Sequence, residues 1–163
     1  MARLQIRGIL RALCRCEVEF IVVGGISAVL QGAPINTFDV DIVHSREPGN
    51  VQRLLTALKE LEAIYRFQPE RRLTPAASHL LSNGHQLLMT KFGPLDILGE
   101  IGRSRSFEDL LPLSYLWDPE PGISARILRL ETHIRIKEEV GEPKDMAVLH
   151  VLRRTLEERQ AAI

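Results

Sequence analysis

Two aspartates interrupt an apolar stretch of the chain, where residues 38–43 have the sequence FDVDIV. The apolar and β-branched residues around them predict a β-strand. Because side chains two positions apart on a strand face the same side, Asp39 and Asp41 are expected to lie side by side. Two carboxylates at that distance repel each other, and burial increases the cost. Such a strand must either be exposed at a sheet edge or meet a positive group that offsets the repulsion.

A divalent cation is a positive group that suits a pair of carboxylates. Mg²⁺ binds one or two carboxylates together with substrate phosphates and keeps several waters. A third aspartate, Asp96, stands in another apolar run, GPLDIL at residues 93–98. Beside the first pair it would complete a metal site, and it could accept a proton from an attacking hydroxyl. The alternatives are a solvated edge strand for Asp39 and Asp41 and a surface position next to a turn for Asp96.

The strand predicted before this pair ends in two glycines. Residues 18–23 are rich in β-branched residues and lead into Gly24 and Gly25, after which residues 26–31 fit a short helix. Glycine lets a ligand approach the backbone closely, and a helix N-terminus favours a phosphate anion. Ser27 could add a hydroxyl contact. An ordinary tight turn between strand and helix explains the same residues equally well.

Helices and strands alternate along the rest of the chain. Apolar spacing predicts a helix that begins near Ile6, and a hairpin is expected across residues 92–94 between strands at 85–91 and 95–100. Residues 63–73 are ambiguous, and residues 123–128 could form an edge strand. Further helices are expected over residues 50–61, from Ser106, over 130–140 and from 144 to about 159. The pattern predicts an α/β (α+β) fold with a mixed β-sheet flanked by helices.

Length and composition fit one domain over residues 1–163, with a core at about 18–111 and a C-terminal strand and helices at about 114–159. The formal net charge is zero, so no overall positive field indicates nucleic acid. Arg7, Arg11 and Arg15 recur every four residues and could form a solvated face or a phosphate-contacting stripe.

The N-terminus has some features of a signal peptide, because arginines precede an apolar run at residues 20–30. Glu17 and Glu19 interrupt that pattern, Gly24 and Gly25 divide the run, and it is too short to span a bilayer. We therefore expect a cytoplasmic chain that makes no membrane contact.

In combination, these features resemble the nucleotidyltransferase superfamily, the fold of DNA polymerase beta and of the antibiotic nucleotidyltransferases. The family pattern is a strand, Gly-Gly or Gly-Ser, a short helix, Asp-x-Asp on the next strand and a later third carboxylate. Residues 32–37, GAPINT, resemble the segment before Asp-x-Asp in minimal and toxin-type (abortive-infection) members. Lys137 and the later Lys144-Asp145 resemble their C-terminal pattern. The resemblance covers residues from about 20 to about 152.

The resemblance implies transfer of a nucleoside monophosphate from a nucleoside triphosphate, such as ATP, to an acceptor hydroxyl or phosphate. The acceptor would be an RNA end, a protein or a small molecule, and pyrophosphate would be released. Mg²⁺ or Mn²⁺ would be held by three carboxylates, those of Asp39, Asp41 and Asp96. The nucleotide would contact the backbone of Gly24 and Gly25, the hydroxyl of Ser27 and the ammonium group of Lys137.

Three positions depart from the family pattern and leave a second interpretation open. Asn36 and Glu142 stand where many relatives carry arginine, and Val148 stands where an acidic residue is common. A catalytically weak or inactive chain would bind a nucleotide or a partner, for example as one half of a toxin–antitoxin pair. Because the chain is short, a partner protein or a second copy in a homodimer could hold the acceptor.

Overall fold

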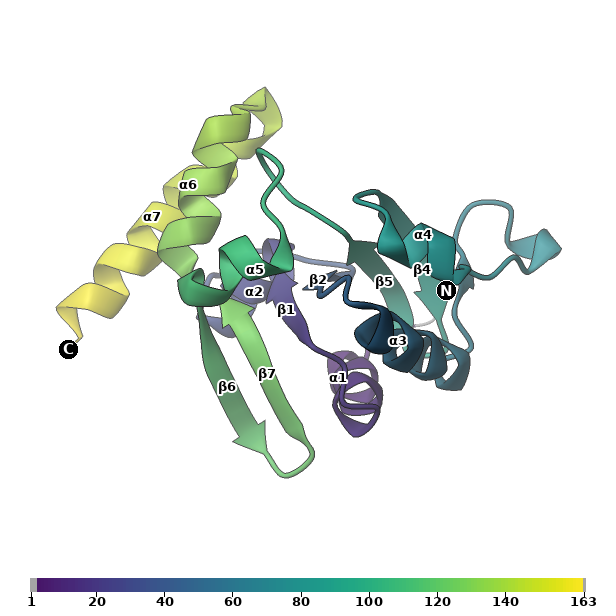
Figure 1. Ribbon diagram of the computed structural model, residues 1–163. Coiled ribbons are helices and arrows are strands. Elements are labelled where there is room, and N and C mark those ends of the chain that lie inside the picture. Colours follow the sequence, from purple (N-terminus) through teal and green to yellow (C-terminus); the bar gives the residue numbers. More distant parts are fainter. Residues whose placement is uncertain (1–2, 163) are drawn as a thin grey trace.

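A mixed β-sheet with the strand order β3-β4-β5-β2-β1-β7-β6 forms the centre of the computed structural model, which describes residues 3–162 (Figure 1). The strands are β1 Phe20–Val23, β2 Val40–His44, β3 Ile64–Tyr65, β4 His85–Thr90, β5 Gly93–Leu98, β6 Ser114–Glu120 and β7 Ile123–Leu128. The α-helices are α1 Ile6–Arg15, α2 Gly24–Leu30, α3 Pro48–Glu60, α4 Ala77–Leu81, α5 Phe107–Leu110, α6 Leu130–Val140 and α7 Met146–Ala161. Short 3₁₀ turns are η1 Pro69–Arg71, η2 Leu111–Leu113 and η3 Pro143–Asp145. This arrangement confirms the predicted α/β class and mixed sheet.

The register of the central strands determines where the predicted site residues lie. β2 runs antiparallel to β1 and parallel to β5. Asp41 stands opposite Val23, the last residue of β1, and opposite Asp96 of β5. The Gly24-Gly25 turn and both aspartates are therefore neighbours in the sheet.

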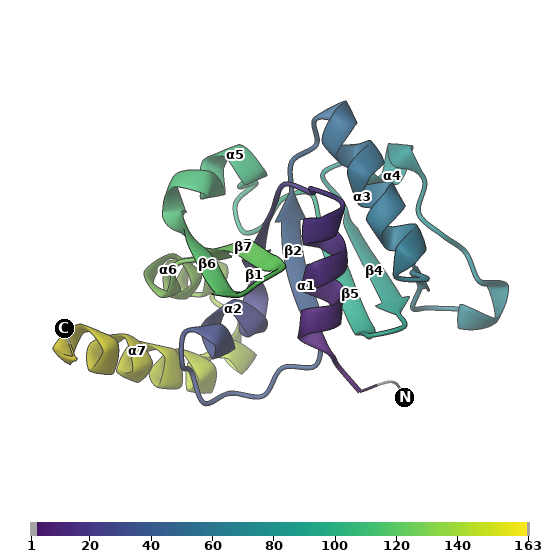
Figure 2. The same ribbon diagram turned by 90° about the horizontal axis from the view of Figure 1, so that it is seen from below.

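One face of the sheet is covered by α1 and α3, which cross the strands in Figure 2. Val40 and Ile42 of β2 point to this face, together with Leu95 and Ile97 of β5. They pack against apolar side chains that recur at helical spacing on the two helices, such as Ile9, Leu10, Leu13, Val51, Leu54 and Leu58. Since side chains alternate along a strand, Asp41 and Asp96 must face the other side.

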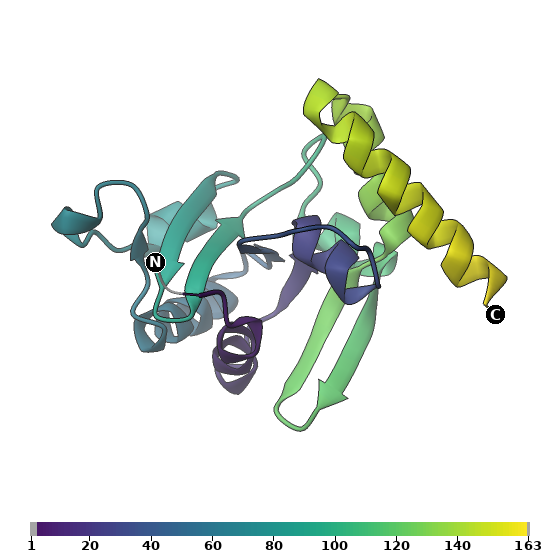
Figure 3. The same cartoon turned by 180° about the vertical axis from the view of Figure 1, so that it is seen from behind.

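The opposite face has a smaller apolar layer. Val43 and Leu98, each two positions beyond an aspartate, pack here with Phe107 of α5 and Ile136 of α6. A third apolar cluster joins α2 to α6 and α7, which lie against each other at one end of the molecule (Figure 3). The aspartates are therefore placed beside α2 and α6 on the less covered face.

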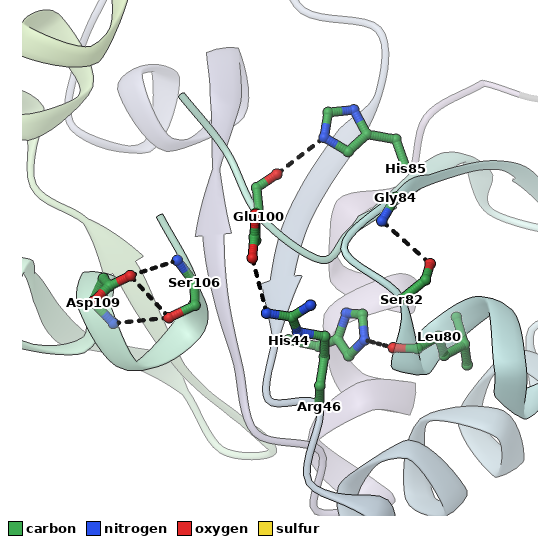
Figure 4. A network of polar contacts seen from close by, with 9 residues as sticks. All are labelled: His44, Arg46, Leu80, Ser82, Gly84, His85, Glu100, Ser106 and Asp109. Carbon is green, nitrogen blue, oxygen red and sulfur yellow. Dashed lines mark hydrogen bonds and ion pairs between the residues drawn. The ribbon is translucent and has the colours of Figure 1, made fainter. Parts of the chain in front are cut away.

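Polar contacts link the C-terminal ends of β2 and β5 to each other, to α4 and to the start of β4 (Figure 4). His44 Nε2 donates to the carbonyl oxygen of Leu80 at 2.7 Å, which ties β2 to α4. Arg46 donates to the carboxylate of Glu100 at 3.0 Å, and the ring of His85 contacts the Glu100 carbonyl oxygen at 3.0 Å. These contacts hold the end of the sheet that lies away from the aspartates.

The edge-strand prediction for residues 123–128 is wrong. This segment, β7, pairs in parallel with β1 and antiparallel with β6, so β6 forms the edge. The sequence obscures β6 because Asp118 and Pro119 interrupt its apolar alternation, and the pairing is irregular between Trp117 and Glu120. Proline is tolerated on an edge strand, where its missing N–H faces no partner.

Several predicted boundaries shift by a few residues. β2 begins at Val40, so Asp39 directly precedes the strand, and β5 begins earlier than expected, at Gly93. The helix expected from Ser106 is α5, and Ser106 caps it by bonding reciprocally with Asp109 (Figure 4). The last helix begins at Met146, after η3. In residues 3–162, no helix has the length and apolar character needed to cross a membrane.

Candidate active site

The three predicted aspartates converge at the start of β2. Asp39 directly precedes that strand, Asp41 lies within it, and Asp96 stands opposite Asp41 on β5. One carboxylate oxygen from each residue lies within 4.8 Å of the others. This confirms the predicted convergence, while the chemical role of the three residues stays a prediction.

Without a metal, the negative charges of the three carboxylates are unfavourable for the folded state. Burial raises the pKa of Asp41 to about 8, and the negative charges of Asp39 and Asp96 act in the same direction. Burial and the charge of Asp96 also raise the pKa of Asp39. Asp41 Oδ1 is buried and has no hydrogen-bond partner among the residues that the structure describes. A divalent cation would satisfy this oxygen and remove the repulsion, so the three residues fit a metal site.

Arg66 also contacts this cluster, and the sequence did not predict it. Its guanidinium donates from Nη1 to Asp96 Oδ1 at 2.9 Å and to the carbonyl oxygen of Leu88 at 3.2 Å. The contact depends on the short strand β3, where Tyr65 pairs with Leu88 of β4. Because residues 63–73 had no clear periodicity, only this long-range pairing could have identified Arg66.

Gly24 is required by the carboxylate next to it. Its φ is +67°, and a Cβ built there would lie 2.1 Å from Asp41 Oδ2. Gly25 is less constrained, since its Cβ would lie 3.3 Å from the hydroxyl oxygen of Thr37. The two glycines therefore have different roles, because only the first is in contact with the cluster.

Ser27 lies beneath the turn and not in an open site. Its side chain is fully buried, and its hydroxyl donates to the carbonyl oxygen of Gly24 at 2.7 Å. In this position Ser27 stabilises the first turn of α2. A direct contact with a nucleotide would require this hydrogen bond to break.

A cleft of about 330 Å³ begins beside the cluster and extends to the C-terminal helices. It is lined by Gly24 and Asp41 on one side and by His133, Lys137 and Asp145 on the other. Clefts of this size accommodate small ligands. Lys137 Nζ lies 3.2 Å from Asp145 Oδ1, so the ammonium group predicted to reach a nucleotide is ion-paired inside the cleft.

His133 is a second cleft residue that the sequence did not predict, because no ligand spacing surrounds it. It is 5% exposed, and its Nε2 is buried without a hydrogen-bond partner among the described residues. Burial lowers the pKa of His133 to about 4, the charge of Lys137 lowers it further, and Asp145 opposes the shift. At neutral pH the ring is therefore uncharged, and its buried Nε2 is unsatisfied among the described residues.

A larger groove of about 590 Å³ lies along α1, on the face of the sheet away from the carboxylates. Its arginines are largely engaged in ion pairs, since Arg7 lies 2.6 Å from Glu120 and Arg15 lies 2.8 Å from Glu60. Arg11 also pairs with Glu120. The pairing favours a solvated, charge-balanced face over a phosphate-contacting stripe.

Comparison with known proteins supports the fold. No protein-family model matches the chain, and no curated protein sequence matches it. A crystal structure from Thermotoga maritima, described as a candidate nucleotidyltransferase, is similar over 94% of this chain and 91% of that one. The TM-score is 0.56 and the sequence identity is 20%. The chain has a nucleotidyltransferase-like fold.

This structural similarity concerns the fold and not the reaction. It agrees with the Gly-Gly turn, the Asp-x-Asp strand and the third aspartate, which the nucleotidyltransferase-like fold brings together at one end of β2. The finer resemblance to toxin-type members stays a prediction.

Proposed function

We propose that the chain is a nucleotidyltransferase, dependent on Mg²⁺ or Mn²⁺, that transfers a nucleoside monophosphate from a nucleoside triphosphate to an acceptor hydroxyl. The observation that carries the proposal is the convergence of Asp39, Asp41 and Asp96 within 4.8 Å on a nucleotidyltransferase-like fold. A buried carboxylate cluster with an unsatisfied oxygen is difficult to explain by stability alone, because the like charges repel.

The three carboxylates would hold the metal, which when bound neutralises the negative charge of the triphosphate. Binding requires the carboxylates to be ionised, and Asp41 must therefore lose the proton that its raised pKa favours. Arg66 offsets part of the charge when no metal is bound, through its contact with Asp96. The Arg66 contact would therefore stabilise the three carboxylates in their positions before the metal and the nucleotide bind.

The nucleotide phosphates are proposed to lie in the cleft between Gly24 and α6. Gly24 and Gly25 have no side chains, so a phosphate could approach their backbone closely. Lys137 would exchange its contact with Asp145 for a phosphate oxygen, and His133 would provide a polar atom at the wall of the cleft. Ser27 would contribute indirectly, because its hydroxyl stabilises the Gly24 turn through a hydrogen bond to the Gly24 carbonyl oxygen.

At the α-phosphorus the proposed reaction forms one bond and breaks one. The acceptor hydroxyl oxygen bonds to the α-phosphorus, and the bond from that phosphorus to the bridging oxygen breaks. Pyrophosphate leaves with the electron pair, and the hydroxyl proton passes to a carboxylate. Asp96 is the proposed proton acceptor, because it belongs to the cluster and stands on β5, on the side of β2 away from β1 and the nucleotide cleft.

A transfer assay tests this function directly. Wild-type protein would be incubated with each labelled nucleoside triphosphate, Mg²⁺ or Mn²⁺, and total RNA or protein extract. We expect labelled acceptor with the wild type and a loss of about 100-fold or more with Asp96→Asn, since the reaction depends on this charge. Asp118→Asn, on the exposed edge strand, is the matched control and should retain activity. Equal labelling by the Asp96 and Asp118 variants would contradict the proposed site.

A second candidate function is a nucleotide-binding or partner-binding module without transfer activity. The charges in the cleft favour it, because Lys137 is paired with Asp145 and Lys144 with Glu142 at 3.0 Å. These pairs weaken the attraction for a triphosphate. Stabilisation of the protein by nucleotide, combined with no labelled acceptor in any extract, would support the module over the enzyme.

A further inference from the structure

Residues 66–74 form an exposed segment that begins at the carboxylate cluster. It follows β3 and projects from the end of the molecule opposite α7 (Figures 1 and 3). Residues 67–74 are all exposed. The segment nevertheless has a defined shape, because the amide of Arg72 donates to the carbonyl of Pro69 at 3.1 Å and that of Tyr65 to the carbonyl of Leu73 at 2.8 Å. Gln68 and Arg72 hold left-handed conformations at the two ends of η1.

The segment combines positive charge with an exposed aromatic ring. Arg66, Arg71 and Arg72 lie within seven residues, against the single acidic residue Glu70. Among the residues that the structure describes, Arg71 and Arg72 form no ion pair. Phe67 is 68% exposed, and its ring lies under the guanidinium of Arg66 at 5.9 Å. Most of the Phe67 ring is therefore open to solvent, beside arginines that could contact an anionic ligand.

The position of this segment relative to the cluster indicates which ligand it meets. Arg66 contacts Asp96 from the β3-β4 side of the sheet, whereas the nucleotide cleft lies on the β1-α6 side, next to Asp41 and Gly24. The two substrates of a transfer reaction must approach the metal from different directions. The segment is therefore on the acceptor side of the proposed active site. A second exposed ring, Phe38 at 78%, directly precedes Asp39.

We propose that residues 66–74 bind the acceptor and that the acceptor is the end of a single-stranded nucleic acid. This inference rests on the proposed nucleotidyltransferase function and specifies its substrate class. Arg71 and Arg72 would contact backbone phosphates, and a terminal base would stack on Phe67. Single-strand binding sites are built from such pairs of charge and aromatic ring.

Binding of labelled oligonucleotides tests the proposal without nucleotide or metal. Fluorescence anisotropy would be measured with single-stranded RNA and DNA of about 12 nucleotides, a length typical of single-strand sites. The variant Arg71→Glu/Arg72→Glu is compared with Arg153→Glu/Arg154→Glu, which changes the net charge equally on α7, at the other end of the molecule. Separate RNA and DNA arms show whether the 2′-hydroxyl contributes.

We expect the loop variant to lose affinity by about tenfold or more, and its slope of log affinity against log salt to fall by about 1.4 for two phosphate contacts. Phe67→Ala should weaken binding by about fivefold or more with an unchanged salt slope, because it removes stacking alone. The α7 variant should bind as the wild type does. The Phe67 and loop variants should melt close to the wild-type temperature, since their side chains are exposed. The α7 variant should melt only slightly lower, because it breaks the surface pairs of Arg153 with Glu138 and of Arg154 with Glu158.

Two results would overturn the inference. The wild type could fail to bind either oligonucleotide, or the α7 variant could lose as much affinity as the loop variant. Stabilisation by Mg²⁺ and nucleoside triphosphate, measured on the same proteins, separates this inference from the proposed function. Nucleotide binding without oligonucleotide binding would leave the transferase proposal standing with another acceptor. Loop-dependent oligonucleotide binding without nucleotide binding would contradict the transferase and retain only the binding surface.

Discussion

Among the three aspartates, Asp41 has the carboxylate whose negative charge is most strongly disfavoured by its surroundings. It lies opposite Asp96 in the sheet, close to Asp39, with one oxygen that has no partner among the described residues. Its raised pKa follows first from burial and then from the neighbouring charges. The stability of the metal-free protein should therefore depend on whether Asp41 is protonated.

The pH dependence of unfolding tests this charge. The pKa of Asp41 is about 8 when folded against 3.8 as the ordinary value, so the folded state binds the proton more tightly. Its contribution to stability is complete below pH 3.8 and is lost as the pH rises towards about 8. We expect Asp41→Asn to gain stability relative to the wild type as the pH rises from about 4 to about 8, measured by urea unfolding without metal.

Asp118→Asn serves as the control, because its side chain is exposed on β6. A difference between Asp41→Asn and the wild type that stays constant over this pH range would contradict the raised pKa. Binding of Mn²⁺ should change in the opposite sense and strengthen with rising pH, because the metal requires the ionised carboxylate.

The sequence identifies the three aspartates but not the two other polar residues near them. Asp39, Asp41 and Asp96 interrupt apolar strands, and that contrast is local and visible. Arg66 and His133 acquire their positions from tertiary packing, through the β3-β4 pairing and the cleft between α6 and Gly24. Such long-range contacts leave no periodic signal in the sequence.

At the scale of the elements, the turn between β1 and α2 contains two adjacent glycines that differ in what their backbone and neighbours require. Gly24 has a positive φ and lies against Asp41, whereas Gly25 has helical geometry and only a tight contact with Thr37. The same chemical change, glycine to alanine, should therefore have two different effects at adjacent positions.

Gly24→Ala should destabilise the protein by about 1–3 kcal/mol, because it strains the backbone and displaces Asp41. Gly25→Ala should change stability by less than about 1 kcal/mol, since alanine is favoured in a helix, yet it should weaken nucleotide binding. Urea unfolding and the shift in melting temperature with nucleotide measure both effects. If Gly25→Ala loses nucleotide binding and stability to the same extent, or loses neither, the turn has no specific role towards phosphate.

Strands whose apolar residues are continuous were predictable, and strands with irregular sequences were not. β1, β2, β4 and β5 were expected because their residues are apolar or β-branched over several positions. The pairing order was not predictable, because β7 joins β1 from about a hundred residues away in the chain. This unrecognised parallel pair explains why residues 123–128 were assigned to an edge.

At the scale of the whole molecule, the carboxylate cluster lies between two features that follow the strand order, the cleft next to β1 and the segment that follows β3. The cleft beside α6 opens on one side, and the arginine-rich segment 66–74 projects on the other. This arrangement suits a reaction with two substrates, one a nucleotide and the other an acceptor. The expectation of a single domain over residues 1–163 and a contribution from a second copy or a partner both stay predictions.

Thermal melting of the wild type and Asp41→Asn, with and without Mg²⁺ and each nucleoside triphosphate, tests the central claim most directly. The claim predicts that metal-free Asp41→Asn melts at the same or a higher temperature at neutral pH, because asparagine replaces a carboxyl group that must take up a proton when it is buried beside two other carboxylates. Mg²⁺ with the preferred nucleotide should stabilise the wild type, by about 2.7 kcal/mol at a ligand concentration 100 times Kd, and should stabilise the variant much less. Equal stabilisation of both proteins would show that nucleotide binds elsewhere and would contradict the assignment of Asp39, Asp41 and Asp96 as the metal site.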